Sequence, residues 1–449
     1  MREAQDLLQL DQRHLVHPLH HPQDHRDPLL LVEGRGAILK DAQGREYIDG
    51  LAGLWNVNVG HGRMELAEAA REQMARLAFN SNYAGASNVP SIQLAAKLVR
   101  LSYPTMSGVY FTTAGAESNE SAFKIARYYW KLRGKPEKVT IISRVHAYHG
   151  VTLGAMSATG MAAYHRMFGP LVPHFLQIPA PYPYRWPGSG DPGTEAADAL
   201  EAAILREGPE RVAAFIAEPV MGAGGVIVPP ATYFPRIREI CDRYDVLFIA
   251  DEVITGFGRT GRWFALGHWG VQPDLVSFAK GVTSAYVPLG GVLLSQRVHA
   301  ALLEAPPDQK FMHAATYSGH PVCCAVALRN LEILEREGLV ERAATVGRHF
   351  LARLQTLQDL PVVGDVRGLG LMCGVELVQD KATKAPALGL GARVMQEARA
   401  RGLIARLRAG SADPPVGDTL CLAPPLVTPE DTLDRIVDIL RESIAAASR

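Results

Sequence analysis

The sequence lacks an excess of charge of either sign. Its 449 residues include 46 Lys and Arg and 46 Asp and Glu, so there is no net basic field to gather nucleic acid or an anionic membrane. It also lacks an apolar run long enough to cross a membrane, and its first residues, MREAQDLLQLDQRHL, lack the apolar core of a signal peptide. These absences argue against nucleic-acid and membrane partners and predict a cytoplasmic protein.

Cysteine is scarce, and its spacing supports neither a disulfide framework nor a zinc site. The five cysteines contain no CxxC pair: Cys241, Cys323, Cys324, Cys373 and Cys421. Reduced thiols in the cytosol are the simplest interpretation. Histidines gather near the N-terminus, at His14, His17, His20, His21 and His25. Because their surroundings are rich in proline and no acid or cysteine set completes a fixed geometry, we predict no metal site.

Near-continuous apolar runs alternate with helix-like segments from about residue 90 onward. The runs are VTIIS at 139–143, AAFIAEP at 213–219, VLFIAD at 246–251 and DLVSFAK at 274–280. This alternation predicts an α/β fold whose central sheet is mostly parallel and covered by helices on both faces. Ligands of such sheets gather at the carboxyl ends of the strands.

The two ends of the chain carry different patterns, and the length favours two structural lobes. AILKDAQGREYIDG at 37–50 predicts a hairpin around Asp41 to Gly44, outside the main sheet. Residues 321–358 predict a pair of amphipathic helices, and residues 362–378 return to strand-like alternation. We therefore predict an N-terminal arm and part of a small domain in residues 1–75, a large domain in 76–325, and the C-terminal part of the small domain in 326–449.

An acid and a lysine follow two of the apolar strands. Asp251 closes FIAD and Lys280 closes VSFAK, so both side chains emerge at the same edge of the sheet. Burial lowers the pKa of a lysine and makes its amine a nucleophile toward an aldehyde. An acid opposite a pyridine nitrogen keeps that ring protonated and electron-withdrawing. Together they predict a cofactor held as a Schiff base, whereas a lone lysine after a strand is more often a solvated surface group.

The segment FTTAGAESNESAFKIARYYW at 111–130 predicts a strand that turns tightly into a helix. The first turn of such a helix presents unpaired N–H groups, which suit a phosphate. The alternative is a structural turn in which Glu117 or Ser118 serves the helix start. Neither GxxxxGKS nor GxGxxG occurs here. The glycine-rich GFGRTG at 256–261 lacks the lysine of a P-loop, and we interpret it as a loop.

Several segments match a known family motif by motif. They are YIDGLAGLWNVNVGHG (47–62), TTAGAESNE (112–120), AYHG (147–150), AEPVMGAGGVIVPP (217–230), DEVITGFGRTG (251–261), AKG (279–281) and TYSGHP (316–321). Over nearly its whole length the sequence resembles the class III aminotransferases of the fold type I pyridoxal-phosphate family, most of all the ω-amino acid (β-alanine):pyruvate branch. The resemblance implies pyridoxal 5′-phosphate as cofactor. It also implies a mostly parallel central sheet in a large domain and a smaller α/β domain built from both chain ends.

Two catalytic residues are implied by this resemblance. Lys280 forms the Schiff base with the cofactor and later moves a proton between the substrate carbon and the C4′ carbon of the cofactor. Asp251 pairs with the pyridine nitrogen. Glu218 is expected near the cofactor as a further acid, although an acid before Pro219 can simply close a strand.

The same resemblance implies a set of cofactor contacts. Gly115 and Ala116 give main-chain donors to the phosphate, and Ala116 stands where relatives usually have a serine, which removes one hydroxyl contact. Tyr148 stacks on one face of the ring and Val253 on the other. Thr316 reaches the phosphate bound by the neighbouring subunit. The site then exists only in a homodimer with shared active sites, and assembly to a tetramer stays open.

Substrate contacts are implied at three positions. Trp55, in GLWNVNVG, resembles an aromatic of the pocket wall in this branch, and Tyr148 lies at the same pocket. Arg406, in GLIARLR, sits where relatives place an arginine that binds a carboxylate, for which the guanidinium fork is suited. The resemblance implies that this arginine swings aside for an apolar amine, as in ω-type enzymes. Arg408 is a rival for this role, and the segment 409–419 looks longer than the usual short turn.

The resemblance predicts a transaminase that acts by a ping-pong mechanism through the Lys280 Schiff base. An ω-amino acid or amine donates its amino group, and a keto acid, pyruvate, accepts it. One alternative is another reaction with the same cofactor, such as decarboxylation, an aminomutase shift or a lyase step, because a fold does not fix the bond that breaks. The other is a non-catalytic binding protein. The presence of both Lys280 and Asp251 argues against it.

Overall fold

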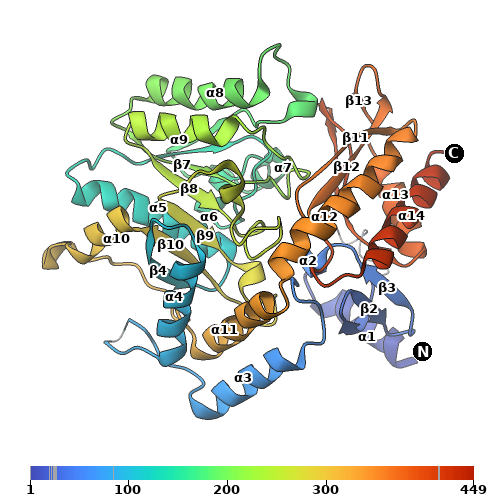
Figure 1. Ribbon diagram of the computed structural model, residues 1–449, viewed down its shortest axis with the longest axis horizontal. Helices are drawn as coiled ribbons and strands as arrows, with labels where there is room; N and C mark the ends of the chain where they lie inside the picture. The colour runs from blue at the N-terminus through green and yellow to red at the C-terminus, as the bar shows by residue number, and fades with distance from the viewer. Residues whose placement is uncertain (1, 20, 22, 24–27, 84, 413–414) are drawn as a thin grey trace.

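The computed structural model describes residues 2–19, 21, 23, 28–83, 85–412 and 415–449. Two of the N-terminal histidines, His20 and His25, and two residues of the 409–419 segment, Asp413 and Pro414, lie outside this description. In Figure 1 a large domain, coloured from teal to yellow, lies beside a smaller one in which orange and red segments meet the blue start of the chain. The predicted α/β fold, with a large and a small domain, is confirmed.

A seven-stranded sheet forms the centre of the large domain. Its strands, in spatial order, are β4 (Met106–Thr112), β10 (Gly290–Ser295), β9 (Leu275–Phe278), β8 (Leu247–Asp251), β7 (Val212–Ala217), β5 (Thr140–Arg144) and β6 (Phe175–Ile178). β10 runs antiparallel to both of its neighbours, and the strands from β9 to β6 pair in parallel. The four apolar runs of the sequence coincide with β5, β7, β8 and β9, so the mostly parallel sheet is confirmed.

Helices cover both faces of this sheet. They are α4 (Val89–Leu101), α5 (Gly115–Leu132), α6 (Leu153–Ala158), α8 (Pro192–Glu207), α9 (Tyr233–Arg243) and α10 (Gln296–Leu303). The short α7 (Ala162–His165) lies beside α6 and buries none of its residues. On β8, Ile249 packs in a cluster with residues of α5, whereas the neighbouring Phe248 packs with residues of α8 and α9. Because each strand is apolar on both sides, its sequence shows a continuous apolar run rather than alternation.

Two further sheets build the small domain. One has the order β11 (Val363–Gly368), β12 (Cys373–Asp380), β18 (Thr419–Leu422) and β15 (Arg406–Arg408), with β13 (Ala385–Pro386) beside β12. The other has the order β1 (Leu31–Arg35), β2 (Ile38–Asp41), β3 (Glu46–Asp49) and β14 (Leu403–Ile404). A two-stranded ribbon, β16 (Ser411–Ala412) and β17 (Pro415–Val416), follows β15. β2 and β3 form the predicted hairpin, and β3 pairs in parallel with β14, so the two chain ends meet in one sheet.

The remaining helices join and flank these sheets. They are α1 (Arg2–His14), α2 (Ala52–Trp55), α3 (Met64–Arg76), α11 (Pro321–Arg336), α12 (Leu339–Gln355), α13 (Leu390–Ala400) and α14 (Glu430–Ala447). α11 and α12 are the predicted helix pair. The domain boundaries after residues 75 and 325 stay predictions, and the second falls inside α11. Within the described ranges, no helix is both long and apolar enough to cross a membrane.

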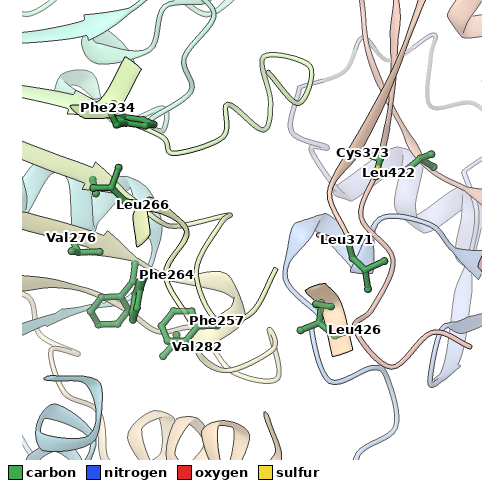
Figure 2. Close-up of a cluster of buried hydrophobic side chains, with 14 of the residues drawn as sticks. Phe234, Phe257, Phe264, Leu266, Val276, Val282, Leu371, Cys373, Leu422 and Leu426 are labelled. Carbon is green, nitrogen blue, oxygen red and sulfur yellow. The ribbon is translucent and has the colours of Figure 1, made fainter. Parts of the chain in front are cut away.

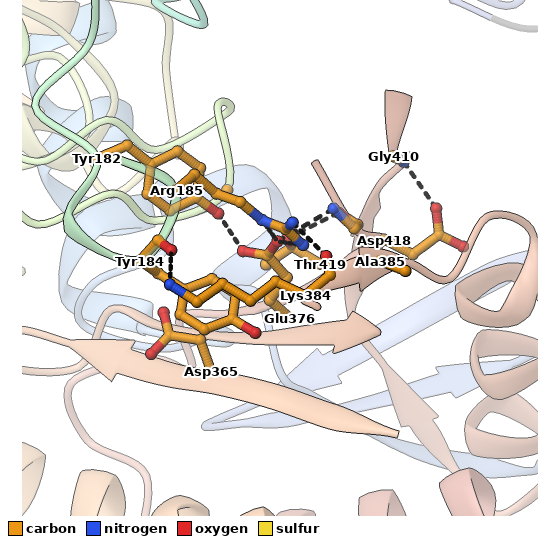
Figure 3. A network of polar contacts seen from close by, with 12 residues as sticks. Tyr182, Tyr184, Arg185, Asp365, Glu376, Lys384, Ala385, Gly410, Asp418 and Thr419 are labelled. Carbon is orange, nitrogen blue, oxygen red and sulfur yellow. Dashed lines mark hydrogen bonds and ion pairs between the residues drawn. The ribbon is translucent and has the colours of Figure 1, made fainter. Parts of the chain in front are cut away.

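Apolar and polar contacts join the two domains. In Figure 2 the large-domain residues Phe257 and Phe264 lie across from Leu371 and Leu426, and all four belong to one buried cluster. At a second place, shown in Figure 3, the buried carboxylate of Glu376 on β12 accepts hydrogen bonds from the side chains of Tyr182 and Arg185, which follow β6. Contacts at both places fix the small domain against the large one.

Candidate active site

Asp251 is the last residue of β8 and lies buried at the carboxyl end of the sheet. Its Oδ2 accepts hydrogen bonds from Nδ2 of Asn119 at 2.8 Å and from Nδ1 of His149 at 2.7 Å. Its Oδ1 accepts from the main-chain N–H of Val253 at 3.1 Å. Three donors from three different segments therefore fix the orientation of this carboxylate.

Asn119 and His149 are site residues that the sequence does not single out. Nδ2 of Asn119 also donates to the main-chain oxygen of His149 at 2.7 Å, which ties the two residues together. Because a carboxylate only accepts hydrogen bonds, Nδ1 of His149 carries a proton. Its buried Nε2 has no partner among the residues described. The one signal for either residue is its place in a matched motif, ESNE or AYHG.

Lys280 lies two residues beyond β9 and begins a short 3-10 turn, Lys280–Val282. Its backbone has a φ of +48°, which is strained for a residue with a side chain. Nδ2 of Asn330 donates to the main-chain oxygens of Gly281 and Val282, each at 2.9 Å, and so holds the turn. Backbone strain that is held in place by its surroundings is typical of functional sites.

The electrostatic surroundings make the amine of Lys280 a ready nucleophile. Burial lowers its pKa to about 8, against the opposing charge of Asp251. Arg406 lowers this pKa further, and Glu218 raises it. Lys280 nevertheless keeps part of its surface accessible. The predicted lysine and acids therefore act on one another electrostatically, together with an arginine from the small domain.

The N-terminus of α5 presents free main-chain donors. Ala114, which precedes the helix, gives no side-chain cap, so the N–H groups of Gly115 and Ala116 have no acceptor within the helix. A Cβ atom on Gly115 would lie 2.8 Å from Cγ1 of Val253. Val253 thus packs directly on the helix start, and the small residues there leave its N–H groups open to an anion.

Side chains also brace this helix start, as the alternative interpretation of the sequence proposed. The carboxylate of Glu117 accepts hydrogen bonds from the main-chain N–H and the hydroxyl of Thr113, at 2.7 and 2.6 Å. The hydroxyl of Ser118 donates to the main-chain oxygen of Phe278 at 3.1 Å, which ties the helix to β9. These three hydrogen bonds do not use the main-chain N–H groups of Gly115 and Ala116, so the structural turn and an anion site can coexist.

Glu218 follows β7 and is buried beside the same site. Its carboxylate accepts hydrogen bonds from the main-chain N–H groups of Tyr148 at 3.0 Å and Gly222 at 2.9 Å. Burial raises the pKa of Glu218, and His149 opposes that shift. The carboxylate thereby fixes the segment of Tyr148, whose ring centroid lies 5.5 Å from that of Tyr164. Tyr164, on α7, is another aromatic that the sequence does not single out.

Arg406 and Arg408 share the short strand β15 but differ in their surroundings. Arg408 is buried; its Nη1 donates to the main-chain oxygen of Ala409 at 2.9 Å, and its Nη2 lies 3.5 Å from Nδ1 of His146. Arg406 is partly exposed, and no described residue forms a hydrogen bond or ion pair with its side chain. Because its charge acts on the pKa of Lys280, Arg406 is the free guanidinium at this site.

Trp55 and Thr316 lie in contrasting environments. Trp55 has a φ of +64° and is only 1% exposed, packed in a cluster with Leu51 and Cys421. Cys421 is the β-ladder partner of Arg406, so the indole lies next to the strand of that arginine. Thr316 is exposed in the segment between α10 and α11. The predicted roles of both residues, in the pocket wall and at a neighbouring subunit, stay predictions.

No group of three or more His, Cys, Asp or Glu side chains forms a candidate metal site in the part of the chain that the structure describes. All five cysteines are free and buried. Burial raises the pKa of Cys241 to about 12. Their thiols therefore stay protonated at neutral pH and behave as small apolar side chains.

Comparison with known proteins decides the family. A family model described as aminotransferase class-III matches residues 20–444. The chain belongs to this family. It is therefore a pyridoxal-phosphate-dependent aminotransferase, an enzyme that moves an amino group from an amine donor to a keto acid.

Alignments with individual relatives cover almost the whole chain of this aminotransferase. The putrescine–pyruvate aminotransferase of Pseudomonas aeruginosa is 41% identical over 421 residues, 92% of this chain and 90% of that protein. The diaminobutyrate–2-oxoglutarate transaminase of Halomonas elongata is 41% identical over 452 residues, 97% of this chain and 95% of that protein. The crystal structure of an (S)-enantioselective omega-transaminase from Thermomicrobium roseum has a TM-score of 0.92 and 49% identity, and the match covers 99% of this chain and 98% of that one.

The residues of the aminotransferase fit its cofactor. The free N–H groups at the start of α5 suit a phosphate. Asp251 offers an oriented carboxylate to a pyridine nitrogen, and Lys280 offers an amine of low pKa to an aldehyde. Since these groups follow β4, β8 and β9, they gather at the carboxyl edge of the sheet, where the sequence predicted them.

The lowered pKa of Lys280 predicts how attachment of pyridoxal phosphate depends on pH. The neutral amine is the nucleophile, so the attachment rate of the apoenzyme is expected to rise with pH and to level off above about 8. At pH 7 roughly one such amine in ten is neutral, against roughly one in three thousand for an ordinary lysine. Absorbance after mixing at a series of pH values measures the rate. A rate that still rises tenfold per pH unit well above pH 8 would contradict the lowered pKa.

Proposed function

We propose that this aminotransferase passes the amino group of an amine or ω-amino acid to pyruvate by a ping-pong mechanism. The observation that carries the proposal is the unengaged guanidinium of Arg406 beside the low-pKa amine of Lys280. One positive group is thus free for one carboxylate. When bound, pyridoxal phosphate supplies the aldehyde that receives the amino group and the ring that takes up the electron pair. The protein supplies orientation, charge and proton transfer.

Lys280 and Asp251 are the proposed catalytic residues. Lys280 attaches the cofactor through its amine and, once the donor has freed it, moves a proton between the substrate carbon and C4′. Its lowered pKa supports this role, because the amine can both accept and release a proton near neutral pH. Asp251, held by Asn119 and His149, keeps the pyridine nitrogen protonated. Glu218 acts through the segment that it fixes.

The proposed cofactor contacts come from four positions. Gly115 and Ala116 donate their main-chain N–H groups to the phosphate. Tyr148 and Val253 take the two faces of the ring. Val253 packs on Gly115 and bonds the carboxylate of Asp251 through its N–H, which supports a place between the phosphate and the pyridine nitrogen. Tyr148 is fixed by its main-chain bond to Glu218, as described above.

The substrate pocket is assigned to Trp55, Tyr148 and Arg406. Arg406 binds the carboxylate of the keto acid, and it swings aside when an amine without a carboxylate enters. Its lack of a partner among the described residues supports this mobility. The aromatic rings then contact the apolar part of the amine.

Among the described residues, Arg406 is the arginine whose charge acts on Lys280 and whose side chain makes no hydrogen bond, which favours an acceptor with one carboxylate. Arg144 is buried and donates to the main-chain oxygen of Glu218 at 2.6 Å, and Arg408 is engaged by Ala409. A dicarboxylic keto acid would bring a second charge without a partner, which costs about 1–3 kcal/mol or more. One relative is named for pyruvate and another for 2-oxoglutarate, so similar chains differ in this respect. The environment of Arg406 supports pyruvate here.

An exposed apolar surface supports a homodimer with shared active sites. Large side chains are exposed near Thr316, including Phe79, Tyr83, Met312 and Tyr317, of which Met312 is 80% exposed. The rings of Phe79 and Tyr317 lie 6.1 Å apart, so these two side chains form one exposed apolar patch next to Thr316. We propose that a second copy covers it and that Thr316 reaches the phosphate of that copy. A tetramer stays open, and a cytoplasmic location stays a prediction of the sequence.

Absorbance of the loaded enzyme tests the proposed reaction. The cofactor band is expected to bleach when putrescine, β-alanine, 4-aminobutyrate or benzylamine is added. It is expected to return at least about tenfold faster with pyruvate than with 2-oxoglutarate, because one carboxylate of the latter has no partner. A band that no amine bleaches contradicts amine transamination. If the band returns faster with 2-oxoglutarate than with pyruvate, pyruvate is not the preferred acceptor, but transamination of the amine still holds.

A further inference from the structure

The glycine-rich segment GFGRTG, at 256–261, contains a buried cation that the proposed mechanism does not use. Arg259 has no exposed surface. Its Nη1 donates to the main-chain oxygens of Leu371 at 3.2 Å and Pro424 at 2.6 Å, and its Nη2 donates to Oδ1 of Asn58 at 2.7 Å. Leu371 and Pro424 belong to the small domain. Arg259 therefore bonds a loop of the large domain to three distant segments of the chain.

The loop around Arg259 is pressed against the small domain. A Cβ atom on Gly261 would lie 2.7 Å from Cα of Ala344 on α12, so no larger residue fits without movement. The main-chain oxygen of Arg259 accepts from the N–H of Leu371 at 3.1 Å, which adds a backbone bond to the two side-chain bonds. Gly261 thus allows the loop to pack closely against the small domain, and the hydrogen bonds of Arg259 stabilise that contact.

Through Asn58, the contacts of Arg259 connect to the turn of the proposed catalytic lysine, Lys280. The amide of Asn58 accepts from Arg259 through Oδ1 and donates through Nδ2 to the main-chain oxygen of Phe257 at 2.9 Å. The same Nδ2 lies 2.6 Å from the place of a Cβ on Gly281, the residue after Lys280. Asn58 therefore packs directly on the strained turn that begins at Lys280. A shift of Asn58 moves the surface against which that turn rests.

Through Pro424, the contacts of Arg259 connect to β18, the neighbour of the strand that carries Arg406. Pro424 lies two residues beyond β18, and β18 pairs with β15 so that Cys421 is opposite Arg406. The bond from Nη1 to Pro424 thus holds the end of the strand beside Arg406. One guanidinium is bonded both to Asn58, which packs beside Lys280, and to Pro424, which follows the strand that pairs with the strand of Arg406.

Packing alone does not explain an arginine at this place. Burial lowers the pKa of Arg259 to about 10, with Asp49 opposing the shift, so the group is charged at neutral pH. Its bonded acceptors are neutral oxygens, and its buried Nε has no partner in the described part of the chain. A buried charge without a bonded carboxylate is costly, and an apolar side chain of similar length would fill the volume at lower cost.

We propose that Arg259 is a positioning residue that sets the separation between Lys280 and Arg406. In this role it fits a carboxylate-bearing acceptor between the reacting amine and the guanidinium. An amine without a carboxylate does not use Arg406 and is indifferent to this separation. The inference rests on the proposed function, since it assumes that Arg406 binds the carboxylate of the acceptor.

Carboxylate affinity of the loaded enzyme tests this role without turnover. The dissociation constant of propionate, an unreactive monocarboxylate, is measured by calorimetry in the wild type, in Arg259→Met and in Arg406→Ala. Arg259→Met is expected to weaken propionate binding about tenfold, toward the loss seen in Arg406→Ala. Arg259→Lys keeps the charge and is expected to recover part of the affinity. Unchanged propionate binding in Arg259→Met overturns the proposal.

The two half-reactions supply the second readout. In Arg259→Met, return of the cofactor band with pyruvate is expected to need about tenfold more pyruvate, while bleaching by benzylamine stays within about threefold of wild type. Equal losses in both half-reactions indicate a general structural role and overturn the proposal. If Arg259→Met does not fold, Asn58→Ala takes its place and must show the same selective loss. If the wild-type enzyme binds propionate but does not react with pyruvate, the proposed acceptor is wrong. The positioning role of Arg259 is then still decided by the propionate measurement.

Discussion

Replacing Lys280 by alanine is expected to lower the transamination rate constant by at least about 10⁴-fold. The change removes the amine that attaches the cofactor and that moves the proton, and general acid–base catalysis alone contributes about 10²–10⁴-fold. The N–H groups at the start of α5 are untouched, so the variant is expected to keep binding pyridoxal phosphate without a covalent bond. Turnover with an amine and pyruvate, beside an absorbance titration of the cofactor, measures both effects. Full activity of Lys280→Ala would falsify the assignment.

A second buried lysine offers a matched control. Burial also lowers the pKa of Lys138 to about 8, but its Nζ donates to the main-chain oxygens of Pro209 at 2.8 Å, Val212 at 2.9 Å and Asp245 at 2.8 Å. Lys138→Met leaves these oxygens without their donor, so it is expected to lower the melting temperature, since each unsatisfied group costs about 1–3 kcal/mol. Its kcat is expected to equal that of the wild type. If Lys138→Met lost as much kcat as Lys280→Ala, the loss in Lys280→Ala would reflect removal of a buried lysine and not a specific catalytic role.

Asp251→Asn is expected to lower kcat by about 10²–10³-fold, the effect typical of removing one preorganised electrostatic group from an active site. Asparagine keeps the size of the side chain and an oxygen for the Nδ1 proton of His149. It loses the negative charge that we propose keeps the pyridine nitrogen protonated. kcat at saturating substrate and the absorption spectrum of the bound cofactor are the measurements. A kcat within threefold of wild type, with an unchanged spectrum, would remove Asp251 from the mechanism.

The neighbouring residue Glu252 is the control for this substitution. It is equally buried, but its carboxylate accepts from the hydroxyls of Tyr103 and Thr255, each at 2.5 Å, away from Asn119 and His149. Burial raises its pKa. Glu252→Gln is therefore expected to change stability and leave kcat unaltered. The comparison separates the effect of losing any buried acid from the effect of losing Asp251, the acid that we propose pairs with the cofactor.

The parts of the site that the sequence predicts are those fixed by strand ends. Asp251 follows β8 and Lys280 follows β9, and parallel strands bring their carboxyl ends to one edge. The start of α5 after β4 follows the same rule. Each of these positions depends on local pattern and on one general property of parallel sheets, so a single sequence suffices to place them.

Partners that come from distant segments are not predictable in this way. Arg406 and Arg408 are two residues apart on one strand, and only the resemblance to the family favours Arg406 over its rival. The difference between them arises from His146 and Ala409, which engage Arg408 and leave Arg406 free. Likewise, the hydrogen bonds from Asn119 and His149 to Asp251 depend on how helix α5, the segment of His149 and the end of β8 approach one another. Such choices are made by packing rather than by local propensity.

Strand direction and loop function are also decided by packing. β10, GGVLLS, is an apolar run like those of the parallel strands, yet it is antiparallel to both neighbours. The run of glycines at 256–261 looked like a simple loop, because the surface that it meets, on α12 and after β18, lies far along the chain. A pattern can show that a segment is buried without showing what buries it.

The parallel pairing of β3 with β14 bears on how the chain folds. Ile48 pairs with Leu403, so the hairpin near the start of the chain gains its last strand only after almost the whole polypeptide has been made. The large sheet lies between these partners in the sequence and can form earlier. Contacts of such long sequence separation slow folding and leave strand edges exposed meanwhile. We therefore expect the edge of β3 that β14 covers to stay exposed until the C-terminal segment has been made. During that interval the hairpin is open to chaperone binding and to aggregation.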